Sequence, residues 1–242
     1  MRYIFISPHL DDVALSVGGI VNNLVNSKID TEIWTFFSGS PNDENLSDFS
    51  LSLHKRWNLP MNAPKIRRLE DIKACKTLGA QYKHFNLPDC IYRKDEDGNP
   101  IVREENDLYQ PIPPSQLFLV NKISDEINRK ATSDDIIISP MAVGNHIDHR
   151  IIVAAITQVS HRPLLFYEDY PYVIKSHSSP IDNSKLTAVK FDLQDENIKT
   201  WHASIAAYQS QITTFWKNTN RMKEEIIDFA GRGGGKNLWN FS

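Results

Sequence analysis

Two short segments of the sequence concentrate imidazole and carboxylate groups, the side chains that bind metal ions and move protons. The first contains His9, Asp11 and Asp12, which lie within four residues, directly after an apolar run at residues 3–7. A turn at this place can aim His9 and Asp12 at one point and leave Asp11 beside it. The alternative is an ordinary helix start, in which one aspartate caps the first turn and the other favours the helix dipole.

The second segment follows another apolar run, at residues 135–139, and contains His146, Asp148 and His149. The two histidines are three residues apart, a spacing that places both side chains on one side of a helical turn. Asp148 lies between them. The alternative is a polar loop whose histidines face solvent.

The positions of the two segments are alike, because each follows a predicted strand. In open α/β sheets, ligands gather at the carboxyl ends of the strands. Together the segments offer up to three histidines and three carboxylates. Catalytic zinc takes three protein ligands from such side chains and keeps a fourth position open for water. The sequence therefore predicts a metal site built from both segments.

Short apolar runs alternate with longer segments of helical periodicity along most of the chain. Several runs are continuous, which is typical of strands buried on both faces of a parallel sheet. The repeated strand–helix units predict an α/β fold, a Rossmann-like three-layer sandwich with a mostly parallel central sheet and helices on both faces. The expected strands cover residues 3–7, 31–37, 81–87, 135–139, 164–168 and 187–193, and the expected helices cover residues 12–26, 70–78, 115–130, 148–159 and 195–217.

Two long polar segments, residues 38–59 and 87–114, do not fit regular elements. Loops of this length in a compact domain are usually functional or disordered. We expect both segments to form rims around the active site, and mobile surface loops are the alternative. The glycine-rich residues 231–236 lack the Ser or Thr that follows in a phosphate-binding loop, so we interpret them as a flexible connection.

The bulk properties of the chain exclude several classes of protein. Its 242 residues suit a single domain over 1–242, and its net charge of −3 gives no basic footprint for nucleic acid. The N-terminal apolar run is too short for a signal peptide, and no apolar stretch is long enough to span a membrane. Cys75 and Cys90 do not resemble a disulfide framework, and a single bond between them is left open. We expect a cytoplasmic protein that binds neither nucleic acid nor membranes; a homo-oligomer is left open.

Three separated motifs resemble those of the LmbE/PIG-L family of zinc-dependent N-deacetylases. Residues 8–12, Pro-His-Leu-Asp-Asp, look like the family's (P/A)HxDD segment, and residues 146–149, His-Ile-Asp-His, look like its HxDH segment. Residues 67–79 resemble its RxxE…A…LG stretch. The resemblance implies a zinc-dependent hydrolase that removes an N-acetyl (N-acyl) group from a small amino sugar or sugar conjugate and releases acetate and a free amine.

The resemblance covers about residues 2–170 and implies roles for the residues that match. By this resemblance His9, Asp12 and His149 would bind zinc. Asp11 would be the general base that takes a proton from the attacking water.

The remaining implied roles concern the second motif and the substrate. His146 would act as electrophile or general acid, Asp148 would orient it, and Arg67 would lie near the substrate. The chain departs from the family pattern at Val13, where glutamate is frequent, but that position is not a ligand. It departs again at Gly144, where one branch of the family has a tyrosine. We therefore expect different surroundings for the oxyanion, the negatively charged oxygen that forms when water attacks the amide carbonyl.

Two further acidic residues, Glu168 and Asp169, lie at the end of the strand expected at residues 164–168. Carboxylates at such a position could enter the cleft and bind sugar hydroxyls, so both are predicted substrate contacts. The alternative is a strand end with ordinary packing.

Two other functions fit parts of the pattern. The ligand set also suits an iron(II) oxygenase with two histidines and one carboxylate, although such oxygenases generally use β-rich barrels. A non-catalytic α/β module that holds a small ligand is the second alternative. Such a module would not need the carboxylate of Asp11 next to the metal ligands. Metal analysis, oxygen consumption and acetate release distinguish the three functions.

Overall fold

A computed structural model of the chain describes residues 1–41, 45–59, 62–159, 163–176 and 178–241. Within these residues seven strands form one sheet in the order β3-β2-β1-β4-β5-β7-β6. The pairs from β3 to β5 are parallel, whereas β7 runs antiparallel to both β5 and β6. The strands are β1 (Tyr3–Ser7), β2 (Thr31–Thr35), β3 (Gln81–His84), β4 (Ile136–Pro140), β5 (Leu164–Tyr167), β6 (Leu186–Lys190) and β7 (Asn237–Phe241).

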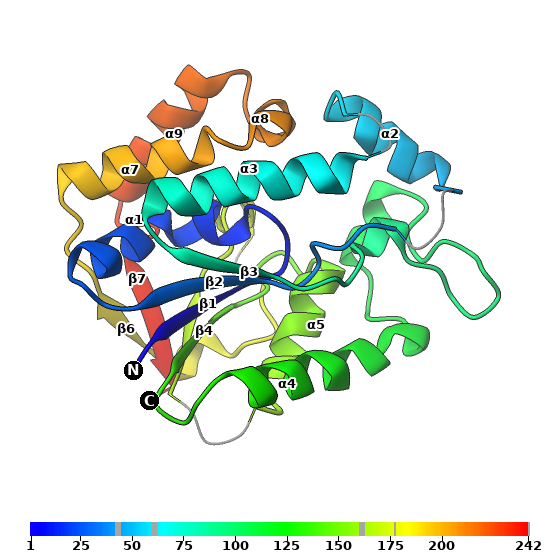
Figure 1. Cartoon of the computed structure of the whole chain (residues 1–242), viewed down its shortest axis with the longest axis horizontal. Helices are drawn as coiled ribbons and strands as arrows, with labels where there is room; N and C mark the ends of the chain where they lie inside the picture. The colour runs from blue at the N-terminus through cyan, green and yellow to red at the C-terminus, as the bar shows by residue number, and fades with distance from the viewer. Residues whose placement is uncertain (42–44, 60–61, 160–162, 177, 242) are drawn as a thin grey trace.

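Helices cover both faces of this sheet (Figure 1). Helices α1, α3 and α7 pack on one face, and α4 and α5 pack on the other. The predicted α/β sandwich with a mostly parallel sheet is therefore confirmed. None of the helices in the described ranges has both the length and the apolar character of a membrane span. The helices are α1 (Asp12–Asn26), α2 (Asp48–Arg56), α3 (Ala63–Leu78), α4 (Phe118–Lys130), α5 (Ile147–Ile156), α6 (Tyr172–Lys175), α7 (Asp195–Ile205), α8 (Gln209–Phe215) and α9 (Thr219–Gly231).

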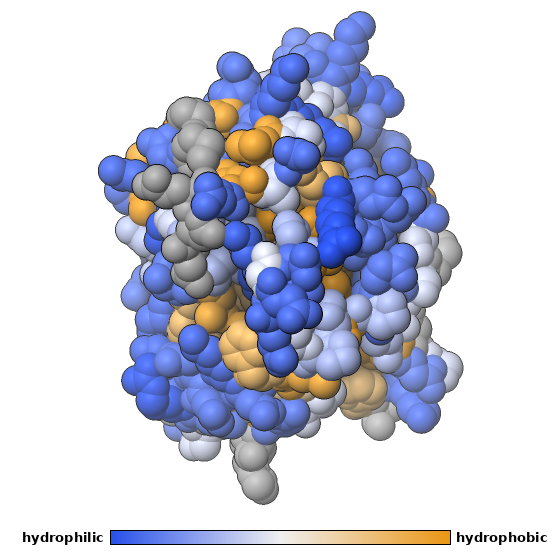
Figure 2. Space-filling view, turned by 90° about the vertical axis from the view of Figure 1, so that its right-hand side faces the viewer, coloured by the Kyte–Doolittle hydropathy of each residue, from blue (hydrophilic) through white to orange (hydrophobic). Residues whose placement is uncertain are grey.

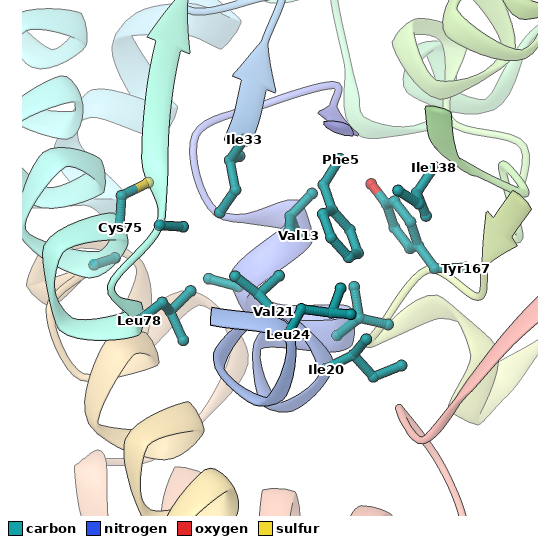
Figure 3. Close-up of a cluster of buried hydrophobic side chains, with 14 of the residues drawn as sticks. Phe5, Val13, Ile20, Val21, Leu24, Ile33, Cys75, Leu78, Ile138 and Tyr167 are labelled. Carbon is teal, nitrogen blue, oxygen red and sulfur yellow. The ribbon is translucent and has the colours of Figure 1, made fainter. Parts of the chain in front are cut away.

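The core on the α1 side of the sheet is built from side chains that the apolar pattern directs inward. Figure 3 shows Phe5 of β1 and Ile33 of β2 near Val13 and Val21 of α1. All four side chains are buried. Complete burial of such a side chain contributes about 1.5–3 kcal/mol. This packing fixes α1 against the sheet and, with it, the acidic residues at the start of α1.

Helix α1 approaches α7 closely because two of its residues lack side chains. A Cβ atom at Gly18 would lie 2.6 Å from Cδ1 of Trp201, and one at Gly19 would lie 2.7 Å from a methyl carbon of Leu193. The indole Nε1 of Trp201 donates a 2.6 Å hydrogen bond to the carbonyl oxygen of Ala14. The C-terminal part of the chain thus holds the first turns of α1 in place.

The long helix predicted over residues 195–217 is wrong, because α7 ends at Ile205 and α8 begins at Gln209. At the break between α7 and α8, two residues of the chain form hydrogen bonds with α3. The Tyr208 hydroxyl donates to Asp71 Oδ1 at 2.7 Å, and the backbone nitrogen and hydroxyl of Ser210 donate to the Glu70 carboxylate at 2.8 and 2.6 Å. These bonds satisfy the start of α8 and turn the chain away from the α7 axis.

Several other elements differ from the prediction. Helix α2 forms inside residues 38–59, of which 42–44 lie outside the described residues. Helix α3 begins at Ala63, well before the expected start at residue 70. Residues 231–236 join α9 to β7, which inserts between β5 and β6. Local sequence patterns did not predict β7 because its place depends on pairing with distant strands.

The strand order reverses between β1 and β4. Strand β1 pairs with β2 on one side and with β4 on the other. The chain therefore builds β2 and β3 on one side of β1 before it returns to begin β4. The crevice at the carboxyl ends of β1 and β4 is the switch point at which α/β sheets bind ligands. The first candidate segment follows β1, and the second follows β4.

Candidate active site

The two candidate segments meet at this switch point. His9 lies in the turn after β1, Asp12 begins α1, and His149 lies in the first turn of α5. The Nδ1 atom of His9 is 3.3 Å from Oδ2 of Asp12, and Nε2 of His149 is 3.4 Å from the same oxygen. All three side chains are buried. The sequence prediction that distant loops bring these groups together agrees with this geometry.

These atoms fit a divalent ion. Two ligands at about 2.0–2.1 Å from a tetrahedral zinc ion lie about 3.3–3.4 Å apart, which matches both distances to Asp12. Nε2 of His149 is buried and has no hydrogen-bond partner among the described residues. A buried ring nitrogen without a partner is costly unless another group, such as a metal ion, satisfies it. Ring nitrogens of His9, His146 and His149 also lie within 4.8 Å of one another.

The charges of the three residues are strongly linked. Burial would raise the pKa of Asp12, but the nearby charge of His149 and the contacts of His9 together outweigh this effect and hold that pKa well below its usual range. Although burial opposes it, the contacts of His149 with Asp12 and Asp169 raise its pKa to about 9. Metal binding requires neutral imidazoles and an ionised carboxylate, so a divalent ion would displace the protons that this cluster holds.

The other ring nitrogen of each predicted histidine ligand is held by a carboxylate. His9 Nε2 donates to Asp148 Oδ2 at 3.0 Å, and His149 Nδ1 donates to Asp169 Oδ1 at 2.6 Å. Metal-binding histidines in proteins usually have such a partner, which fixes the tautomer and the orientation of the ring. The two aspartates therefore leave His9 Nδ1 and His149 Nε2 facing Asp12.

This arrangement bears on the roles expected for two residues. The Asp148 carboxylate accepts a hydrogen bond from the His9 ring, and the Asp148 backbone nitrogen donates to His146 Nδ1 at 3.3 Å. Asp169 is buried behind His149 and also accepts from the backbone nitrogen of Val143 at 2.9 Å. Its position supports orientation of His149 instead of the predicted substrate contact. Glu168 is half-buried and lies outside the cavity wall.

Asp11 lies beside the candidate metal ligands in a strained backbone conformation. Its φ and ψ angles are 139° and −31°, a region that residues with a side chain rarely adopt. Its carboxylate is buried, and burial raises its pKa to about 7 against the opposing charge of Arg67. Strain and a displaced pKa at one residue are typical of a functional site.

Arg67 of α3, which the resemblance placed near the substrate, lies next to Asp11 and lines the cavity. Its Nη2 donates to the carbonyl oxygen of Leu10 at 3.2 Å and to Asp11 Oδ2 at 3.4 Å. Its Nη1 lies 3.9 Å from Asp89 Oδ2, and its guanidinium carbon lies 4.8 Å from the centre of the Trp57 ring. Arg67 therefore joins α3, the turn after β1 and the segment around Asp89 at the cavity wall.

The residues Asp89, Cys90 and Arg93 were not predicted from the sequence. The backbone nitrogen of Cys90 donates to Asp148 Oδ2 at 3.0 Å, and Nη2 of Arg93 donates to Asp148 Oδ1. Asp89 Oδ2 lies 3.9 Å from His9 Nε2. The one signal in the sequence was their place at the start of the long polar segment 87–114.

A cavity of about 370 Å³ is lined by side chains of both candidate segments, including Asp11, Asp12 and His146, together with Arg67 and Asp89. Both long segments contribute to its walls, as expected for rims around an active site. Figure 2 shows the side of the molecule at the carboxyl ends of the strands, where hydrophilic residues dominate and hydrophobic ones gather in patches between them. The apolar and aromatic wall residues are Leu53, Trp57, Ile91, Leu108, Tyr109, Tyr172 and Phe215, and polar residues of the rim include Glu105, Lys175 and Gln211.

The family assignment follows from comparison with known proteins. The family described as "PIG-L: GlcNAc-PI de-N-acetylase" matches residues 4–160, a range that includes both candidate segments. The chain belongs to this family. The resemblance noted from three sequence motifs is thereby confirmed.

Known relatives of this PIG-L family member are named deacetylases. The 2′-N-acetylparomamine deacetylase of Niallia circulans is 32% identical over 192 residues, which cover 70% of this chain and 67% of the relative. The enzyme of the same name from Streptomyces fradiae is 28% identical over 186 residues, which cover 71% of this chain and 57% of the relative. A solved deacetylase–bog complex from the teicoplanin biosynthesis pathway is 26% identical, with a TM-score of 0.84 and coverage of 99% and 97%.

His146 occupies the position of the first histidine in the family's HxDH motif, and it lines the cavity. Burial, together with the charges of His9 and His149, holds the pKa of His146 well below its usual range. Because Nδ1 accepts from the Asp148 backbone nitrogen, the proton of the neutral ring lies on Nε2. His146 therefore has a hydrogen-bond donor available at the cavity.

Gly144, where one branch of the PIG-L family has a tyrosine, has a φ of +84°. A Cβ atom at this position would lie 3.0 Å from Cβ and Cδ1 of Tyr172. The ring of Tyr172 thus fills the space above Gly144, and its centre lies 5.8 Å from that of the His149 ring. In this chain an aromatic side chain from the start of α6 covers the part of the cavity next to the glycine.

Proposed function

We propose that this protein is a zinc-dependent N-deacetylase that hydrolyses the acetamide of an N-acetylated amino sugar or sugar conjugate. One observation carries the proposal. Nε2 of His149, which is buried and has no hydrogen-bond partner among the described residues, faces the same oxygen of Asp12 as Nδ1 of His9 does. Asp11 lines the cavity beside them. The names of the relatives support the same reaction class.

Within this proposal His9, Asp12 and His149 hold the ion. A bound zinc ion polarises a carbonyl group and lowers the pKa of a bound water toward 7. Asp148 and Asp169 fix the two histidine rings through their other nitrogens, so the binding geometry exists before an ion arrives.

Asp11 is the proposed general base. Its carboxylate takes a proton from the attacking water and delivers it to the nitrogen that leaves. A base works best when its pKa lies near the working pH, and burial brings the pKa of Asp11 to about 7. The Arg67 guanidinium keeps the carboxylate in place and limits that rise in pKa.

His146 is the proposed donor to the carbonyl oxygen of the amide as this oxygen gains negative charge. The Nε2–H group of His146 is already in place, so it can donate a hydrogen bond to that oxygen without any rearrangement at the moment of reaction. The backbone nitrogen of Asp148 holds the ring through Nδ1. Asp148 thus keeps the role proposed for it, the orientation of His146, through its backbone nitrogen.

The cavity suits a sugar-sized ligand. Its volume of about 370 Å³ lies in the range of ordinary small-molecule sites. Aromatic walls such as Trp57 and Tyr109 can pack on the apolar faces of a sugar ring, and polar rim groups such as Glu105 and Gln211 can bind its hydroxyl or amino groups. The same ligand set would suit an iron(II) oxygenase, but the family and the α/β fold favour hydrolysis.

Acetate release from a panel of N-acetylated amino sugars tests the proposal. The panel includes N-acetylglucosamine conjugates and 2′-N-acetylparomamine, each assayed with zinc and with a chelator. We expect acetate with at least one substrate, loss of activity with chelator and recovery with zinc. No acetate from any substrate by the zinc-loaded protein would refute the deacetylase assignment.

The Asp11→Asn variant tests the base. We expect unchanged zinc content and a rate about 10²- to 10⁴-fold lower, the usual contribution of general base catalysis. A zinc-loaded Asp11→Asn protein with the wild-type rate would exclude Asp11 as the base.

A further inference from the structure

Asp148 is fully buried, and hydrogen-bond donors contact both of its carboxylate oxygens. Oδ2 accepts from His9 Nε2 and from the backbone nitrogen of Cys90, each at 3.0 Å. Oδ1 accepts from Nη2 of Arg93. The orientation of this carboxylate, and through it that of the His9 ring, is thus set by the segment that contains Cys90 and Arg93.

Arg93 is itself buried, with 7% of its surface exposed. Its Nε and Nη1 atoms are buried and find no hydrogen-bond partner in the described parts of the chain. Its guanidinium carbon lies 4.9 Å from the centre of the Phe37 ring. Taking an arginine out of water is expensive, and a buried ion pair with unsatisfied N–H groups is a poor source of stability. Fold stability alone therefore does not explain the presence of this arginine.

The contact with Asp148 gives Arg93 a place in the metal centre. Two hydrogen bonds link Arg93 to His9 through the Asp148 carboxylate. Arg93 Nη2 donates to Asp148 Oδ1, and His9 Nε2 donates to Asp148 Oδ2. His9 Nδ1, on the opposite side of the ring, lies 3.3 Å from Asp12 Oδ2. A rotation of the Asp148 carboxylate would therefore turn the ring nitrogen that faces the proposed ion.

We propose that Arg93 is a positioning residue of the metal centre, which holds the Asp148 carboxylate in the orientation that presents His9 Nδ1 to a divalent ion. The proposal rests on the metal site of the proposed function but not on its reaction. Arg93 touches neither the ion nor the substrate in this account and acts through Asp148. A guanidinium suits the task because its planar N–H groups define a direction, whereas a lysine ammonium is a point charge.

Zinc affinity of the metal-free protein, measured by competition with a chromogenic chelator, tests the proposal. Removal of a group that orients a metal ligand typically weakens metal binding about 10- to 100-fold. We expect a loss of this size in Arg93→Gln. Arg93→Lys keeps the charge but not the planar donor, so its loss should be smaller than that of Arg93→Gln and still measurable.

Arg2→Gln is the matched control, because Arg2 forms another ion pair with a buried aspartate. Its Nη2 donates to Asp135 Oδ2 at 2.8 Å. This pair lies at the amino-terminal ends of β1 and β4, whereas the proposed metal site lies at their carboxyl ends. We expect Arg2→Gln to lower the melting temperature and leave zinc affinity unchanged. A folded Arg93→Gln protein with wild-type zinc affinity overturns the proposal, as does an equal loss of affinity in Arg2→Gln. If Arg93→Gln does not fold, wild-type affinity in Arg93→Lys overturns it.

A double-mutant cycle separates action through Asp148 from a general effect on packing. In an Asp148→Asn background the effect of Arg93→Gln on zinc affinity should largely disappear, because residues that act through one contact are strongly non-additive. An undiminished effect in that background would contradict the proposed route. These measurements use no substrate, so failure to release acetate would refute the deacetylase and leave the role of Arg93 standing.

Discussion

Oδ2 of Asp11 lies 3.4 Å from Nη2 of Arg67, and both side chains are buried and line the cavity. Burial raises the pKa of Asp11 to about 7, and the positive charge of Arg67 is the largest influence that opposes this rise. Arg67 thus affects the proton affinity of the proposed base as well as its position.

Replacement of Arg67 by methionine should shift the pH dependence of the reaction. The base must be ionised to accept a proton, so activity rises with pH through the pKa of Asp11. Loss of the Arg67 charge raises that pKa further, and the acidic limb of kcat/KM should move to higher pH. Steady-state rates between about pH 5 and 9 measure the shift.

The neighbouring Arg68 provides the control. Its Nη2 donates to the Ser40 hydroxyl at 3.0 Å on the exposed surface. Arg68→Met should leave the acidic limb in place. An acidic limb that stays unchanged in Arg67→Met, or moves to lower pH, would rule out this influence on Asp11.

The strained backbone of Asp11 predicts a conflict between stability and function. At φ 139° a Cβ atom is unfavourable, whereas glycine adopts the conformation readily. Asp11→Gly and Asp11→Ala both remove the carboxylate, but Asp11→Gly also removes the strain. We expect the glycine variant to be more stable than the alanine variant by about 1–3 kcal/mol, and both to be inactive.

Urea unfolding of the two metal-free variants measures this difference directly. The comparison is matched, because the lost carboxylate contributes equally to both. An alanine variant as stable as the glycine variant, or more stable, would show that the turn relaxes without strain.

The sequence predicted the convergence of the two motifs for a physical reason. His9 and His149 each follow a parallel strand, and the carboxyl ends of such strands lie at one edge of the sheet. The adjacency of β1 and β4 then brings the two motifs together. The periodicity of 12–26 likewise defined α1, whose buried residues form the core shown in Figure 3.

The contacts between side chains of different elements could not be predicted in this way. Asp148 lies between two histidines in the sequence, yet its carboxylate reaches the ring of His9 from the other motif. Arg93 gave no signal beyond its place in the polar segment 87–114, because the path of that segment depends on packing over the sheet. The break after Ile205 depends on tertiary contacts such as that of Ser210 with Glu70, which override helix propensity.

The fit of Tyr172 against Gly144 predicts an effect of added bulk at the cavity. Gly144→Ala places a Cβ atom 3.0 Å from the Tyr172 ring at a φ of +84°. We expect a loss of about 1–3 kcal/mol in the free energy of unfolding and a lower kcat/KM, because Tyr172 must move from the cavity wall. Thermal unfolding and acetate release measure the two effects.

Gly98→Ala separates the steric effect from the cost of the backbone. Gly98 has a similar φ of +81°, but a Cβ atom there would meet no atom of the described residues within 4 Å. Gly98→Ala should lose stability only because alanine disfavours this positive φ, and it should keep the wild-type kcat/KM. Equal losses of both quantities in the two variants would mean that Tyr172 does not constrain residue 144.

The contact between Arg2 and Asp135 predicts how stability changes in acid. Burial would raise the pKa of Asp135, but the hydrogen bond and charge of Arg2 and the hydrogen bond from Thr132 together outweigh burial and lower that pKa in the folded protein. The resulting stabilisation is fully present when the pH is above the pKa of an aspartate in the unfolded chain, about 3.9. It disappears as the pH falls through the lower pKa that Asp135 has in the folded protein. Asp135→Asn should therefore reduce the free energy of unfolding by about 1 kcal/mol at pH 7 and by progressively less below about pH 4. Urea unfolding of both proteins across this range measures the difference, and a constant or growing difference in acid would contradict the assigned ion pair.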